Sequence, residues 1–419
     1  MAFAFASPIM AAFAPAMMPL ARSMPRVPLS ATPMPLEAAP QMMLDPAFDP
    51  ASTLDHLGST VAFADQSGKL AGTFFMVSLF PYIAFLYFLG YEKNNVPKTA
   101  YFGFQFLLLF VISTVFTGIV TKGTYSSTLA DVDWLHGGAE ALLTTTNLYV
   151  ASGFRNAMAG DKDPEGGSFR YPAFGVFALV VLFTAIGPSV LGLEQHSAFL
   201  FGLGNLPENP LGALAAAAEP DNALSIPTWA IHFSSVFEWL FAMGMVNQYA
   251  VATGNEKWKA LTWGMLPLHA SGVAACTYHF FYNSPDVGFL VTLQAFLTLL
   301  GNSTVCIAAV LIALSNGWNF QDAIADANPF NKEEKAAYTP PPLKLQEMQS
   351  TPLIAAELLL LTVISSYLMK YGETLLGITF EPETAGAILG GLICLGIPSA
   401  VGYRFYSLPK DQGSSTTAA

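Results

Sequence analysis

Four histidines and three glutamates lie inside apolar stretches of the chain, where ionisable side chains are costly and usually functional. They are His136, His232, His269 and His279, together with Glu140, Glu238 and Glu357. A neutral imidazole can bind haem iron, the magnesium of chlorophyll or a transition metal. Carboxylates and imidazoles can also relay protons or bind a solute along a polar pathway. A third alternative is a purely structural network of hydrogen bonds.

The spacing of these residues suggests where they lie along their helices. His136 and Glu140 are four residues apart and therefore share one helix face. We expect His136, His232 and His279 toward the non-stromal side, and His269 and Glu238 nearer mid-membrane. A metal enzyme would draw its ligands from Asp131, Asp133, His136 and Glu140. The residues we single out for a ligand or proton pathway are Glu140, Glu238, His136, His232, His269, His279, Asn147 and Gln294.

The composition requires a membrane to hold these residues. Of 419 residues, 53% are apolar and only 11% are charged, whereas a soluble domain carries about 25% charged residues. The net charge is −12 and no basic block occurs. This excludes a soluble globular enzyme, a disordered chain and a nucleic-acid binder. An all-α, polytopic bundle of membrane helices is the fold class that remains.

Nine segments are long and apolar enough, or nearly so, to cross a bilayer, which takes roughly 20 residues. The third segment is the most polar of them. The predicted spans are 73–91, 100–121, 135–153, 172–193, 228–250, 259–281, 287–314, 352–371 and 384–406.

The basic residues test this count. With nine spans, twelve Lys and Arg residues fall on one side of the membrane and three on the other, leaving Arg22 and Arg26 in the N-terminal region. The positive-inside rule predicts such a bias for a correct topology. We therefore expect a stromal C-terminus, if the protein resides in a plastid.

The remaining segments follow from this topology. Residues 1–60 are rich in Ala, Pro, Met and Ser, with no acidic residue before Glu37, which is typical of a plastid targeting segment. We predict a first membrane block at 73–193, a non-stromal loop at 194–227 and a second block at 228–314. A stromal loop at 315–351, the last two spans at 352–406 and a disordered tail at 407–419 complete the division.

The chain also contains a weak internal repeat. Glu140-Ala-Leu-Leu-Thr in the third span is followed by Asn147, and Gln294-Ala-Phe-Leu-Thr in the seventh span is followed by Asn302. Four spans separate equivalent points, so the copies would run in the same direction. We therefore predict parallel three-span repeats, related by an axis near the membrane normal.

Two stretches resemble a known group. Asp131-Val-Asp-Trp-Leu-His-Gly-Gly-Ala-Glu140 and Pro227-Thr-Trp-Ala-Ile-His-Phe-Ser-Ser-Val-Phe-Glu-Trp239 are similar to paired domains of unknown function. These domains occur in the hypothetical-chloroplast-frame forty-nine group of plastid and cyanobacterial membrane proteins. The resemblance covers roughly 75–155 and 225–315. It implies a photosynthetic membrane, thylakoid or inner envelope, and no particular reaction.

Three functional classes remain open. The first is a transporter-like bundle with Glu140 and Glu238 near the repeat interface. The second is a non-catalytic accessory or assembly factor of photosynthetic complexes, which would hold chlorophyll or haem through His232, His269 or His279. An intramembrane metal enzyme is the least favoured class. The expected partners are the lipid bilayer and photosynthetic membrane complexes, with no nucleic acid.

Overall fold

A computed structural model describes residues 69–162, 164–193, 195, 222–321, 338–339, 341–376 and 384–408. The predicted targeting segment 1–60 lies outside the described residues. So do most of the predicted loop 194–227, part of the predicted loop 315–351 and all but two residues of the predicted tail 407–419. The described residues form α-helices with short 3-10 and π turns and no strands.

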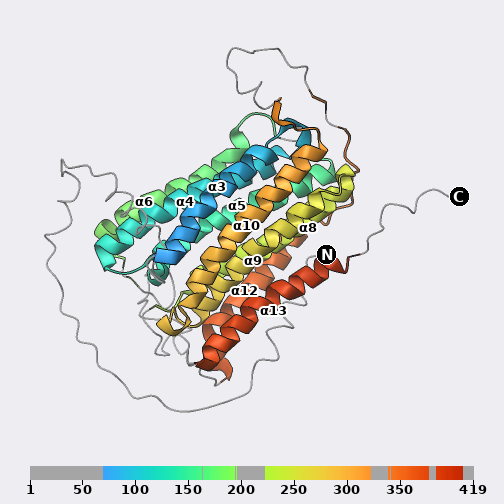
Figure 1. The fold of residues 1–419 in the computed structure, drawn as a ribbon. Helices are drawn as coiled ribbons and strands as arrows, with labels where there is room; N and C mark the ends of the chain where they lie inside the picture. The colour runs from blue at the N-terminus through green and yellow to red at the C-terminus, as the bar shows by residue number, and fades with distance from the viewer. Residues whose placement is uncertain are drawn as a thin grey trace, which may run out of the picture.

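The described residues contain nine α-helices, one for each predicted span, and they form a bundle (Figure 1). A π-helical turn at Gly187–Leu191 follows α6. The helices are α3 Lys69–Leu89, α4 Lys98–Tyr125, α5 Asp133–Ala159, α6 Tyr171–Ile186, α8 Ile226–Thr253, α9 Trp258–Phe280, α10 Phe289–Ser315, α12 Thr351–Leu376 and α13 Thr384–Tyr406.

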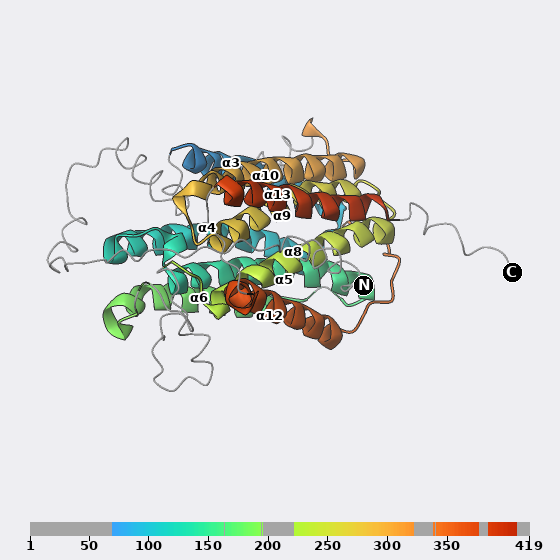
Figure 2. The same ribbon diagram turned by 90° about the horizontal axis from the view of Figure 1, so that it is seen from below.

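Seven of these helical segments are long and apolar enough to cross a membrane. The other two, α5 and α9, are as long but carry more polar side chains, and more than half of the residues of each are buried. Their neighbours shield them from the surroundings: α5 packs against α4 and α8, and α9 packs against α8, α10 and α13. Figure 2 shows α3, α10 and α13 on one side of the bundle and α5, α6 and α12 on the other.

Two groups of three consecutive helices make matching contacts. We call α3, α4 and α5 the first unit, and α8, α9 and α10 the second unit. Asn147 on α5 donates a hydrogen bond to the carbonyl of Ser235 on α8 (3.0 Å). Asn302 on α10 donates in the same way to the carbonyl of Ser78 on α3 (3.1 Å). The last helix of each unit is thus fixed to the first helix of the other.

Contacts inside the two units also correspond. The Tyr82 hydroxyl donates to the carbonyl of Phe104 (2.6 Å), and the Trp239 indole nitrogen donates to the carbonyl of Met265 (3.1 Å). Both bonds join the first helix of a unit to its second helix. The second and third helices approach closely at a glycine in each unit, at Gly103 in the first and Gly264 in the second.

The backbones of α4 and α5 approach each other closely at Gly153. A Cβ atom built there would lie 2.2 Å from the backbone nitrogen of Ala100. Backbone atoms cannot move aside as a flexible side chain can, so the site requires glycine. Gly138 lies on the same helix, and a Cβ atom there would meet nothing within 4 Å.

We therefore predict that Gly153→Ala destabilises the bundle by about 2 kcal/mol through overpacking. Gly138→Ala should leave stability unchanged or raise it by up to about 1 kcal/mol, because alanine is the better helix former. The midpoint of thermal unfolding in detergent micelles measures both. Equal midpoints for the two variants would contradict the close approach of α4 to α5.

Candidate functional site

Three buried histidines from three helices meet in the bundle. His136 on α5, His232 on α8 and His279 on α9 are each at most 4% exposed. The Nε2 atoms of His136 and His232 are 2.8 Å apart. One ring nitrogen of each histidine lies within 4.8 Å of one on each of the other two. We call these residues the histidine cluster.

The position of the cluster is set by the way α5 and α8 begin. The Asp133 carboxylate at the start of α5 accepts a hydrogen bond from the backbone nitrogen of Ser225 (2.8 Å). Ser225 is the N-cap of α8, and its hydroxyl accepts from the backbone nitrogen of Thr228. The Thr228 hydroxyl donates to the carbonyl of Asp133 (3.3 Å). These bonds hold the two helix starts together, one turn before His136 and His232.

His279 is oriented by a chain of hydrogen bonds. Its Nδ1 atom lies 2.7 Å from Oδ1 of Asn283. The amide nitrogen of Asn283 donates to the Asp131 carboxylate (2.7 Å) and to the carbonyl of Ala130 (3.1 Å). Since the amide nitrogen serves two acceptors, the amide oxygen faces His279 and accepts the Nδ1 proton. The Nε2 atom of neutral His279 therefore keeps a free lone pair.

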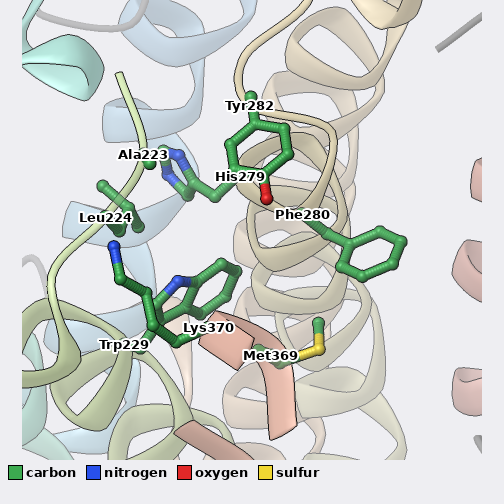
Figure 3. Close-up of a pocket in the computed structure, with 8 residues that line it drawn as sticks. All are labelled: Ala223, Leu224, Trp229, His279, Phe280, Tyr282, Met369 and Lys370. Atoms are coloured by element: carbon green, nitrogen blue, oxygen red, sulfur yellow. The ribbon is translucent and has the colours of Figure 1, made fainter. Parts of the chain in front are cut away.

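A small pocket adjoins the cluster at His279 (Figure 3). Residues from α8, α9, α12, the segment before α8 and the turn after α9 line it. The basic residue among them is Lys370, whose side chain is 6% exposed. The lining residues are Ala223, Leu224, Trp229, His279, Phe280, Tyr282, Met369 and Lys370.

Further polar residues lie deeper between the same helices. Glu140 follows His136 by one turn of α5 and is also buried. Asn147 donates to both the carbonyl and the hydroxyl of Ser235, each at 3.0 Å. The Ser234 hydroxyl donates to one carboxylate oxygen of Glu238 (2.6 Å).

Several atoms of this deeper group have no hydrogen-bond partner among the described residues. They are Oε2 of Glu238, Oδ1 of Asn147 and both ring nitrogens of His269. All three side chains are at most 4% exposed. Buried polar atoms are normally paired, so each of these needs an explanation.

Not every singled-out residue belongs to this region. Gln294 lies on α10, which packs chiefly against α9 and α3, and its carbonyl accepts a hydrogen bond from Ser271. Glu357 lies on α12, where Gln349 donates to its carboxylate (2.8 Å). Of the ligands expected for a metal enzyme, only His136 is in the group that the described residues offer to a metal.

The sequence analysis did not single out three residues of the region. Asn283 follows His279 by four residues, a spacing that could have suggested a contact, but the chain leaves α9 in between. No sequence pattern around Ser235 or Lys370 indicated that these residues lie in this region. Lys370 lies in a separate helix, α12, and reaches the pocket only through the packing of α12 on α8.

Comparison with known proteins places these residues in two recognised domains. A family described as "Protein of unknown function (DUF3593)" matches residues 71–159. A second, "Protein of unknown function (DUF2499)", matches residues 223–311. These two ranges coincide with the first and second units and include the histidine cluster. No solved structure matches the chain.

Two relatives connect the chain to photosynthetic organisms. It is 53% identical over 88 residues to a "Ycf49-like protein" of Synechocystis, covering 21% of this chain and 85% of the relative. It is 39% identical over 84 residues to an "Uncharacterized protein ycf49" of Cyanophora paradoxa, covering 20% of this chain and 82% of the relative. The chain therefore belongs to the Ycf49-like family, as its sequence resemblance predicted.

Proposed function

We propose that this protein is a cation transporter of a photosynthetic membrane, with its path between α5, α8 and α9. The observation that carries the proposal is the set of unpaired buried polar atoms of Glu238, Asn147 and His269. An unsatisfied polar group costs several kcal/mol in hydrocarbon. Such groups are kept in membrane helices chiefly where an ion, a proton or water occupies the space between them.

These polar side chains follow one another along the three helices. The rings of His232 and His279 are 5.0 Å apart near the start of α8. Further along α8, Trp239 bonds to Met265 on α9. Glu238 adjoins Trp239 and His269 follows Met265 by one turn, so these two ionisable residues lie at about the same level. On α5, the polar side chains of this group are Glu140 and Asn147.

The far end of the series is closed by packed aromatic rings. Phe154 near the end of α5, Tyr249 near the end of α8 and Trp258 at the start of α9 lie in mutual contact, with ring centroids 5.0–5.7 Å apart. All three are at most 1% exposed. Release of a cation at this end would require the helices to move, as alternating access requires.

The matching contacts of the two units support this function further. They favour an origin of the two units as parallel repeats. The two units have the same orientation in the bundle and carry equivalent hydrogen bonds. The two family matches also divide the chain at the units. In transporters built from repeats, the substrate site lies at the interface between the copies. The histidine cluster and Glu238 lie at such an interface.

The relatives and the charge distribution support a plastid location. Both relatives come from photosynthetic organisms. We assign the protein to the thylakoid or inner envelope membrane, with the C-terminus in the stroma. The basis for the orientation is the twelve-to-three division of Lys and Arg between the two sides.

Haem or chlorophyll ligation, and with it an accessory role, is the second candidate. A macrocycle needs an open face beside the ligating imidazole. The rings of His232 and His279 are each within 5.0 Å of another imidazole of the cluster, so that space is occupied. The geometry therefore favours a small cation over a pigment.

We predict that Glu238→Gln slows cation flux at least tenfold in proteoliposomes. The amide keeps the shape and can still accept from Ser234, but it cannot carry the charge that a passing cation needs. Internal dyes that report pH or divalent metal measure flux of protons and of Zn²⁺ under an imposed gradient. Glu357→Gln is the matched control, because Glu357 lies on α12 and outside the path. Unchanged flux of both ions in Glu238→Gln would refute the proposal.

A second prediction separates packing from transport. Asn147→Leu should lower stability by about 2 kcal/mol and Asn302→Leu by about 1 kcal/mol, since the first removes two interhelical hydrogen bonds and the second removes one. Only Asn147→Leu should also slow flux, because Asn302 lies between α10 and α3. Thermal unfolding and flux on the same preparations measure the two effects. Equal loss of flux in both variants would mean that Asn147 acts only through packing.

A further inference from the structure

We infer that His136, His232 and His279 form an intramembrane binding site for a transition-metal dication such as Zn²⁺. The inference goes beyond the expected metal ligands, of which only His136 takes part. It rests on the geometry of the cluster, and it rests on the proposed function only where it names the cation that the transporter would carry.

The spacing of the ring nitrogens suits a tetrahedral metal. Zn²⁺ binds imidazole nitrogen at about 2.0–2.1 Å, which separates two ligand nitrogens by about 3.3 Å in a tetrahedral site. The Nε2 atoms of His136 and His232 are 2.8 Å apart, and the ligand atoms of all three histidines lie within 4.8 Å of one another. Small ring rotations would bring all three to the required separation, with no movement of the backbone.

The surroundings of His279 are those of a metal ligand. Ligating histidines usually donate their second ring nitrogen to an oxygen, which fixes the tautomer and the ring orientation. His279 does so through Asn283, which is held by Asp131. This chain of bonds directs a free lone pair into the cluster, whereas a histidine that serves only to fill space needs no such support.

Charge near the cluster can compensate a dication. The three imidazoles are neutral donors, so a buried ion of charge +2 needs negative charge nearby. Asp131 lies behind Asn283, Asp133 lies one turn before His136 and Glu140 lies one turn after it. Lys370, on the wall of the adjoining pocket, carries a positive charge that acts against a bound dication.

Helix packing alone does not demand histidine at these positions. The matched contacts of the two units relate Asn147 to Asn302, Ser235 to Ser78 and Phe104 to Met265. Counting from these pairs, the equivalents of the cluster in the other unit are Val291, Phe75 and Gly118. Residues without polar side chains thus occupy the equivalent positions in the other unit. Packing therefore does not explain why all three positions of the cluster carry imidazoles.

The donor set defines the class of cation. Imidazole suits Zn²⁺, Cu²⁺, Ni²⁺ and Fe²⁺, whereas Mg²⁺ and Ca²⁺ prefer oxygen ligands. We therefore expect the cluster to bind Zn²⁺ and Co²⁺ and to leave Mg²⁺ unbound at equal concentration.

The test uses the full chain, purified in detergent with an affinity tag that contains no histidine and stripped of metal by a chelator. Calorimetric titration with Zn²⁺ should show one ion per chain. Co²⁺ in its place should give the intense visible absorption of a tetrahedral ion. His136→Asn, His232→Asn and His279→Asn should each weaken binding at least 100-fold and remove the Co²⁺ absorption. Glu357→Gln, at a carboxylate on α12 outside the cluster and the path, should change the affinity less than twofold.

Asn283→Ala tests the orientation of His279 and should weaken Zn²⁺ binding 10- to 100-fold. Where a variant does not fold, X-ray absorption of the Zn²⁺-loaded wild type still counts its imidazole ligands, which should be three. The inference is overturned if the wild type binds no stoichiometric Zn²⁺, or if Glu357→Gln weakens binding as much as the cluster variants do. Those outcomes would leave a hydrogen-bonded network of imidazoles.

The two proposals can fail separately. Zn²⁺ binding without Zn²⁺ or proton flux would keep the metal site and remove the transport function. Proton flux without Zn²⁺ binding would keep the pathway and remove the metal site.

Discussion

Two of the nine helices in the described part of the chain are too polar to face lipid along their length, and this constraint shapes the rest of the bundle. The helices α5 and α9 carry His136, Glu140, Asn147, His269 and His279, whose polar groups lose hydration in a membrane and have to be sheltered within the protein. The other helices shield them, with α8 between them. The remaining helices can be almost uniformly apolar because they meet the polar groups only on their inner sides.

The first and second units show how one packing scheme can serve two purposes. Equivalent asparagines join α5 to α8 and α10 to α3. On the α10–α3 side, Val291 and Phe75 stand at the positions that His136 and His232 hold on the α5–α8 side, where Glu238 also lies. The same backbone arrangement therefore supplies a structural contact on one side of the bundle and holds the buried ionisable side chains on the other.

Much of this architecture follows from residue type and order. Segment length and hydropathy predicted all nine helices, because a membrane helix satisfies its backbone internally and needs little from distant residues. The polar third span was also recognisable as unusual. The lipid environment explains why: a carboxylate such as Glu140 on an apolar segment has to face inward. Asn147 and Asn302 stand in similar sequence contexts, and the two side chains make similar hydrogen bonds.

The sequence by itself determined the class of protein, the helices and the shortlist of buried ionisable residues, because those depend on local composition. Only the tertiary structure decided which of these residues meet. His136, His232 and His279 are separated by 96 and 47 residues in the chain, and their convergence depends on how α5, α8 and α9 pack. The same packing brings Asn283 and Lys370 to His279 and leaves Gln294 and Glu357 elsewhere. Spacing along one helix carries no information about the rotation of its neighbours.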